Sequence, residues 1–185
     1  DLAGGSWGGL HGEPTGDENQ GVTTESSSMC VRMHAGATSD LWIKLGRFKA
    51  PFDTTSIPAT STVVSSTLVM HRNGDPTTND FSQGTQITSA NVGTALQLVD
   101  YASSSFGNTS FGSSAFLTTN VRMPYILNAA GRAYIDAQIA AGTSTVLAVR
   151  FDADVNNTPP AWSSNGISAQ GCYASEQVGT GNDPV

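Results

Sequence analysis

Two stretches of this sequence decide its fold. Residues 52–70 read FDTTSIPATSTVVSSTLVM, and residues 125–157 read YILNAAGRAYIDAQIAAGTSTVLAVRFDADVNN. The first predicts a strand entry, a turn at Pro58 and a strand over Val63–Met70 that is β-branched at its start. No stretch of comparable strength points to catalysis.

The second stretch predicts one helix and one strand. Asn128 is a suitable N-cap, the alanines that follow favour a helix over Asn128–Ala141, and Gly142 can end it. Thr145–Phe151 then alternates as a strand. A single short helix among strands predicts a helix that caps one open end of a β-structure.

Short runs with strand-like alternation recur along the chain, separated by turn signals. They are Met29–His34, Leu41–Phe48, Leu96–Tyr101, Ala115–Met123 (stopped by Pro124) and Ile167–Ser175. Surface loops are expected over Thr77–Asn91, Ser103–Ser114 and Asp152–Asn165. This pattern predicts an all-β, jelly-roll-type antiparallel β-sandwich over residues 29–185, preceded by an extended, irregular N-terminal arm over residues 1–28.

Several motifs, taken in order, resemble those of one known family. They are FDTTSIP at 52–58, LNAAG at 127–131, LAVR at 147–150, and YASE at 173–176 with a later Asp183-Pro184. This order resembles DNRLRE-type (disaggregatase-related) β-sandwich modules, in a variant similar to phage structural proteins. The resemblance implies a surface or secreted module, a carbohydrate-binding appendage, or a part of a phage virion.

The resemblance also implies a final strand after Asp183-Pro184, where this sequence stops at Val185. Two interpretations remain open: the sequence is trimmed there, or a neighbouring subunit supplies the last strand. An open sheet edge of that kind would recruit pairing.

Composition excludes some partners. Charged residues make up 12% of the chain, the net charge is −7, and the eight Lys and Arg residues form no run. A phosphate-binding surface needs clustered positive charge, so we expect neither direct nucleic-acid binding nor attraction to anionic membranes. No apolar run approaches the ~18 residues of a membrane span.

The two cysteines, Cys30 and Cys172, each lie in an expected strand. They can pair as one disulfide between the ends of the sandwich, or remain as two buried thiols.

The best polar cluster follows the Thr145–Phe151 strand. Asp152, Asp154 and Asn156 alternate there, and hard cations such as calcium bind several oxygen ligands. The alternative is a solvated loop with Asx turns. No other cofactor is expected, because no zinc-type ligand spacing and no nucleophile elbow occur.

Two sets of residues are candidates for contact with other molecules. Flat aromatic rings stack on sugars, so Trp162, Trp42 and Tyr173 are glycan-binding candidates, with core packing as the alternative. Trp7, Leu10 and Val185 are interface candidates, and Trp7 can instead pack onto its own domain.

These observations favour a non-enzymatic virion structural protein at the virion surface. A capsid decoration (cement) protein or a tail-associated module would stabilise contacts with a major capsid or tail protein and form a homo-oligomer such as a trimer. The alternative is a carbohydrate-binding or adhesin module of a secreted or cell-surface bacterial protein. An enzyme is the weakest hypothesis, because nothing in the sequence selects a pair of acids.

Overall fold

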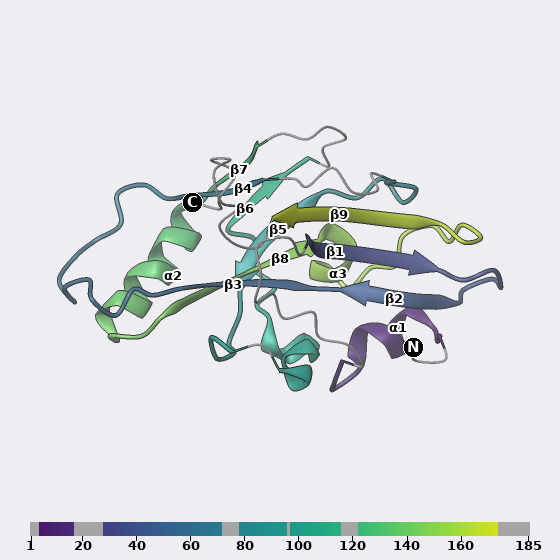
Figure 1. Cartoon of the computed structure of the whole chain (residues 1–185), viewed down its shortest axis with the longest axis horizontal. Coiled ribbons are helices and arrows are strands. Elements are labelled where there is room, and N and C mark those ends of the chain that lie inside the picture. The colour runs from purple at the N-terminus through teal and green to yellow at the C-terminus, as the bar shows by residue number, and fades with distance from the viewer. Residues whose placement is uncertain (1–3, 17–27, 72–77, 96, 116–121, 174–185) are drawn as a thin grey trace.

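The chain folds as an antiparallel β-sandwich with short helices, which confirms the fold class predicted from the sequence (Figure 1). The computed structural model describes residues 4–16, 28–71, 78–95, 97–115 and 122–173. Among these residues, no helix is long and apolar enough to cross a membrane.

One sheet has the strand order β2-β1-β9. Its strands are β1 (Ser28–Ala35), β2 (Trp42–Gly46) and β9 (Ile167–Tyr173). Val31, Met33 and Ala35 of β1 are buried, while the residues between them are partly exposed. This alternation places one face of the sheet on the core, as the sequence of residues 29–34 predicts.

A second sheet has the order β3-β8-β5-β6. Its strands are β3 (Phe48–Phe52), β8 (Thr145–Phe151), β5 (Thr85–Ser89) and β6 (Gly112–Ser114). All seven residues of β8 are buried, because this strand is paired on both edges and covered on both faces. The prediction of a surface loop over Thr77–Asn91 is wrong, since β5 lies inside the sheet next to β8.

The stretch expected as one strand over Leu41–Phe48 is two strands in different sheets. β2 ends at Gly46, Arg47 lies between the strands, and β3 begins at Phe48. The chain therefore crosses from one sheet to the other at Arg47, and the side chain of this residue enters the interior (Figure 1).

The third sheet is a two-stranded ribbon of β4 (Thr67–His71) and β7 (Arg122–Ile126). β4 begins later than the predicted strand over Val63–Met70. Pro124 pairs with Val69 inside β7 instead of ending a strand, and its exposed position suits a residue with no backbone donor.

The predicted capping helix is α2 (Ala129–Ala140). The Asn128 side chain accepts a hydrogen bond from the Gly131 backbone nitrogen, and Gly142 has a positive φ of 65° just past the helix end. The helix packs against β5 and β8.

Three segments differ from their predicted structure. Residues Trp7–Gly12, expected in an irregular arm, form helix α1; residues Leu98–Tyr101, expected as a strand, form the 3-10 helix η1, followed by η2 (Ser103–Ser105). The loop expected from Asp152 begins with a helical turn, α3 (Asp152–Val155). Trp7 and Leu10 of α1 belong to the same hydrophobic core as β1, β2 and β8, so this helix packs as part of the sandwich.

The two cysteines are not directly opposed in the sheet. In the pairing of β1 with β9, Cys30 lies opposite Gly171 and Cys172 lies opposite Met29. The Cys172 side chain is buried in the core, and the Cys30 side chain is outside the described part of the structure.

Candidate functional site

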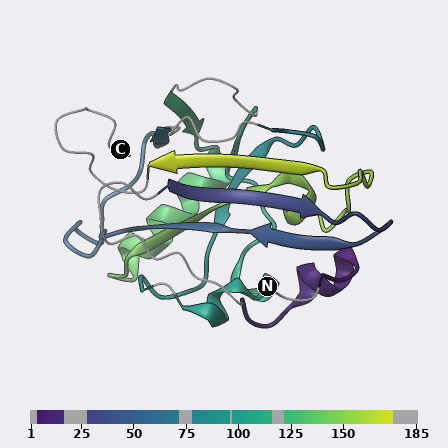
Figure 2. The same cartoon turned by 45° about the vertical axis from the view of Figure 1, so that its right-hand side comes forward.

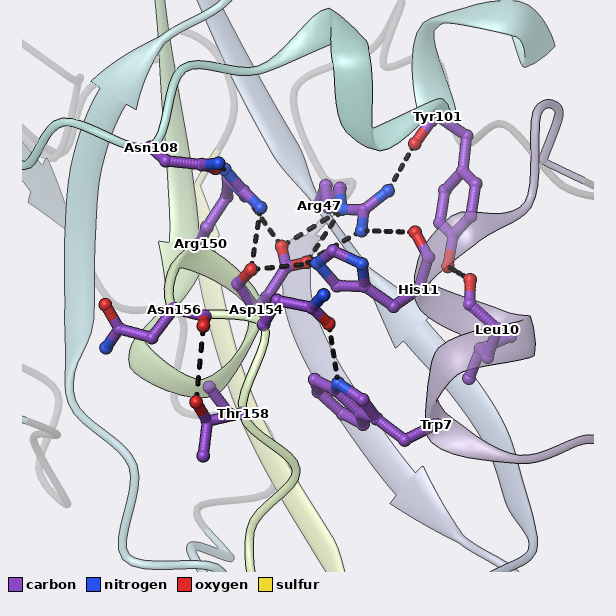
Figure 3. Close-up of polar contacts among 12 residues, drawn as sticks. Trp7, Leu10, His11, Arg47, Tyr101, Asn108, Arg150, Asp154, Asn156 and Thr158 are labelled. Atoms are coloured by element: carbon purple, nitrogen blue, oxygen red, sulfur yellow. Dashed lines mark hydrogen bonds and ion pairs between the residues drawn. The ribbon is translucent and has the colours of Figure 1, made fainter.

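The most concentrated polar cluster of the described residues surrounds the carboxylate of Asp154 (Figure 3). β8 leads directly into the single turn of α3, which turns the Asp154 side chain into the interior, where the residue is 1% exposed. A lone buried carboxylate is costly, so its partners decide what the cluster can do.

Arg150 is the first partner, one helical turn earlier in the chain. Its Nε donates to Asp154 Oδ2 over 2.7 Å, and its Nη2 donates to the Asp154 carbonyl over 2.9 Å. Its Nη1 donates to the carbonyl of Gly107 over 3.0 Å and to Asn108 Oδ1 over 3.3 Å. Arg150 is fully buried and is held from both sides.

Arg47, at the crossing between β2 and β3, is the second partner. Its Nε lies 3.1 and 3.0 Å from the two Asp154 carboxylate oxygens, and its Nη2 donates to Oδ1 over 2.7 Å. The same guanidinium donates to the carbonyls of His11 and Tyr101 and stacks on the Tyr101 ring at 4.5 Å. This paired geometry is the strong form of arginine–carboxylate contact.

Helix α1 closes the cluster from outside. His11 Nε2 lies 3.0 Å from the Asp154 carbonyl oxygen and 3.3 Å from Asp154 Oδ1. The Trp7 indole donates to Asn157 Oδ1 over 3.2 Å, and the Tyr101 hydroxyl donates to the Leu10 carbonyl over 3.0 Å. The N-terminal helix is therefore fastened to the domain by polar contacts from α3, Arg47 and η1 (Figure 3).

Two guanidinium groups face one carboxylate, so the cluster carries an excess of buried positive charge. Burial alone would raise the pKa of Asp154, but the hydrogen bonds from His11, Arg47 and Arg150 outweigh it and hold that pKa far below its usual range. Carbonyl oxygens and the Tyr101 and Phe106 rings take up the remaining positive charge. The carboxylate is thus a fixed anion and has no role as a proton donor near neutral pH.

A second buried ion pair lies two residues further along the chain. Lys49 Nζ donates to Asp100 Oδ2 over 2.6 Å and to the carbonyls of Gly93 and Ala95 over 2.8 and 2.6 Å. All three ammonium hydrogens therefore have an acceptor. This pair fastens the segment before η1 to strand β3.

The predicted calcium site is corrected by these contacts. Both Asp154 oxygens face arginines, and the Asp152 carboxylate accepts hydrogen bonds from the Gly84 backbone nitrogen and Gln86 Nε2. Asn156 is exposed and does not point toward either acid (Figure 3). Two buried cations beside Asp154 repel a third, and the described residues hold no cluster of three metal-ligating side chains.

The predicted glycan-binding aromatics do not form an exposed strip. Trp42 is fully buried in the core, with its ring 5.1 Å from that of Trp7, so this prediction is wrong for Trp42. Trp162 is half-buried against the same core, and its buried indole nitrogen has no hydrogen-bond partner. Tyr173 ends β9, and its side chain is outside the described part of the structure.

The interface candidates are corrected in a similar way. Trp7 and Leu10 are 4% and 6% exposed, which leaves almost no surface of either side chain for a neighbouring subunit. Of the two alternatives for Trp7, packing onto its own domain is the observed one. Val185 lies outside the described residues.

Sequence reasoning missed most of this cluster. Arg47 and His11 contact Asp154 across sequence separations of 107 and 143 residues, which no local pattern reveals. Only Arg150, four residues before Asp154, had a local signal, because that spacing brings two side chains together on a helical turn.

A shallow groove of about 360 Å³ lies beside α2. It is lined by uncharged residues: Ala90, Asn91, Val92, Gly93, Tyr134, Gln138, Thr143, Ser144 and Val146. This groove therefore lacks the facing pair of carboxylates that glycoside hydrolysis requires.

Comparison with known proteins yields no relative. No family model, no curated protein and no solved structure matches the chain. The class established by fold and site is an antiparallel β-sandwich with an internal charge cluster, and the resemblance to DNRLRE-type modules stays a prediction.

Proposed function

We propose that this chain is a non-enzymatic structural module of a virion, located at the virion surface. Its role would be that of a capsid decoration (cement) protein or a tail-associated module that adds contacts between neighbouring subunits, such as those of a major capsid or tail protein. The order of family-like motifs from residue 52 onward supports the virion assignment.

The observation that carries the structural role is the saturation of the Asp154 cluster. Its carboxylate, both guanidiniums and the His11 ring are directed at one another and at backbone carbonyls. Such a cluster stabilises the attachment of α1 and presents no nucleophile or titrating acid to a substrate. A rigid sandwich with its N-terminal helix fastened down suits a module that binds by its surface.

A carbohydrate-binding or adhesin module is the second candidate, and the groove beside α2 favours it. Asn91, Gln138 and Ser144 offer amide and hydroxyl groups there, next to the half-buried ring of Tyr134. Uncharged hydrogen-bonding groups around an aromatic ring suit a neutral sugar. This candidate no longer depends on Trp42.

The test is the native mass of the complete chain, measured by light scattering over a range of concentrations. The subunit-contact role predicts a closed oligomer, with a mass that is a multiple of 19.1 kDa. A monomer at every concentration, together with binding on a glycan array that Gln138→Ala removes, would replace this proposal with the carbohydrate-binding module.

A further inference from the structure

The fold brings together basic residues that are scattered in the sequence. Arg32 and His34 alternate with the buried Val31 and Met33 along β1, so they face away from the core. Lys44 of β2 lies directly opposite His34 in the strand register. We call Arg32, His34 and Lys44 the basic face. It belongs to the sheet β2-β1-β9, which Figure 2 shows in front of α2, β8 and α3.

This arrangement carries an energetic cost. Like charges that lie directly opposite each other on neighbouring strands are destabilising. Partial burial, followed by the positive charges of Arg32 and Lys44, lowers the pKa of His34. The cost suggests that the basic face meets negative charge in its functional state.

Arg32 provides an independent sign of a missing partner. Its Nε is buried and has no hydrogen-bond partner in the protein. Its cross-strand neighbours, Gly46 and Ala169, are small and have no side-chain acceptor. A buried donor without an acceptor is rare in native proteins, and an approaching carboxylate would satisfy it.

The charge of the whole chain indicates what the partner is. Lys49, Arg47 and Arg150 are held in buried ion pairs, so few basic residues remain for the surface. The chain has 15 acidic residues and a net charge of −7. Most of its remaining surface is therefore opposite in sign to the basic face.

We propose that the basic face binds a carboxylate-bearing surface of a second copy of this chain. The contact is heterologous, because a basic patch on one copy meets an acidic patch on the next, and contacts of this type close into rings when the rotation allows. The inference rests on the proposed function as a module that adds subunit contacts, and it names the surface responsible.

The experiment measures self-association of the full chain by sedimentation velocity. Arg32→Gln, Lys44→Gln and the double variant each remove positive charge from the basic face. Arg122→Gln, exposed on β7 in another sheet, is the matched control for net charge. We expect the double variant to weaken association at least about tenfold and the control less than about twofold, with wild-type association weakening as salt increases.

A pH series separates the basic face from general charge effects. The charged groups around His34 are Arg32, Lys44 and Asp80, whose carboxylate accepts from the backbone nitrogen of Ile167 opposite His34. Protonation of His34 adds positive charge, so wild-type association should tighten between about pH 7.5 and 5.5, where most carboxylates stay ionised. His34→Gln should remove this tightening.

The outcomes distinguish the two proposals. Wild-type association that the double variant leaves intact overturns the basic face as the interface, while the proposed function stands. A wild-type chain that stays monomeric overturns both. Loss of association in the double variant and in Arg122→Gln to the same extent shows a net-charge effect and also overturns the assignment to this face.

Discussion

Asp154→Asn tests whether the buried charge cluster fastens the fold. The substitution keeps the side-chain shape but removes the anion, so the guanidiniums of Arg47 and Arg150 lose their counter-charge in a region where both are almost completely buried. Removing one partner of a buried ion pair typically costs about 3–5 kcal/mol. We expect a loss of that size, measured by urea denaturation as a lower midpoint at unchanged slope.

The control is Asp152→Asn, the same substitution two residues earlier in the same helical turn. Asp152 accepts hydrogen bonds from the Gly84 backbone nitrogen and Gln86 Nε2 and contacts no cation in the described structure. Its loss should cost about 1–2 kcal/mol. Equal costs for the two variants would refute the reasoning, because they would show that Arg47 and Arg150 do not depend on the Asp154 charge.

The pH dependence of stability gives a second readout of the same cluster. The pKa of Asp154 is lowered in the folded protein, so its contribution is present above the unfolded value of 3.8 and is lost as pH falls below that value. The wild-type free energy of unfolding should therefore fall by up to about 1.4 kcal/mol per pH unit from this group alone in the acid range. The acid slope of Asp154→Asn should be shallower by that amount, and an unchanged slope would contradict the assignment.

Three further predictions concern the fastening of other segments. Lys49→Met should cost about 3 kcal/mol because it leaves Asp100 buried without its cation, and hydrogen exchange should increase over residues 91–101, whereas equal protection in the variant would count against it. Trp7→Ala should cost about 3–5 kcal/mol by thermal denaturation, and a cost below about 1 kcal/mol would show that α1 is not packed in the core. Gly131→Ala should destabilise α2 by about 1–3 kcal/mol although alanine favours helices, because its Cβ would lie 2.8 Å from Phe111 Cβ, while the control Gly8→Ala in α1, with open space around it, should not destabilise.

The sequence predicted those elements whose local pattern and tertiary role agree. α2 has an N-cap and a glycine stop, and β8 has a continuous apolar run, so both appear near their predicted bounds. β5, the sequence TQITS, was missed because its buried positions include Thr85 and Thr88. The Thr85 hydroxyl lies 2.7 Å from the Tyr125 hydroxyl, so a threonine is accommodated inside the sheet by a partner distant in sequence.

The opposite error occurred at η1. Leu98 and Val99 favoured a strand by their apolar character, yet both are exposed in the structure. The segment is positioned by the buried Asp100, which binds Lys49, and by the backbone hydrogen bond from Gly16 to Leu98. A buried ion pair, which no period of the sequence indicates, therefore determined the local structure.

Asp154 illustrates how far sequence reasoning reaches at a site. The spacing of acids after a strand correctly selected a residue at the centre of a polar cluster, but the expected chemistry was wrong. Calcium was inferred from the oxygen ligands alone, whereas the charge of the surroundings decides the role, and that charge comes from Arg47 and Arg150. Only the topology brings Arg47 to Asp154.

The crossing from β2 to β3 explains why both buried ion pairs lie where they do. A strand that leaves one sheet for another interrupts the regular ladder, so the adjoining segments need other hydrogen-bond donors. Arg47 lies at the crossing and Lys49 lies just inside β3; together they donate to the backbone carbonyls of His11, Gly93, Ala95 and Tyr101. These carbonyls belong to three separate segments that pack around the corner of the sandwich. We infer that the corner is held by side-chain cations in place of a backbone ladder, and that an apolar residue at Arg47 would leave His11 and Tyr101 without these donors even if it filled the same volume.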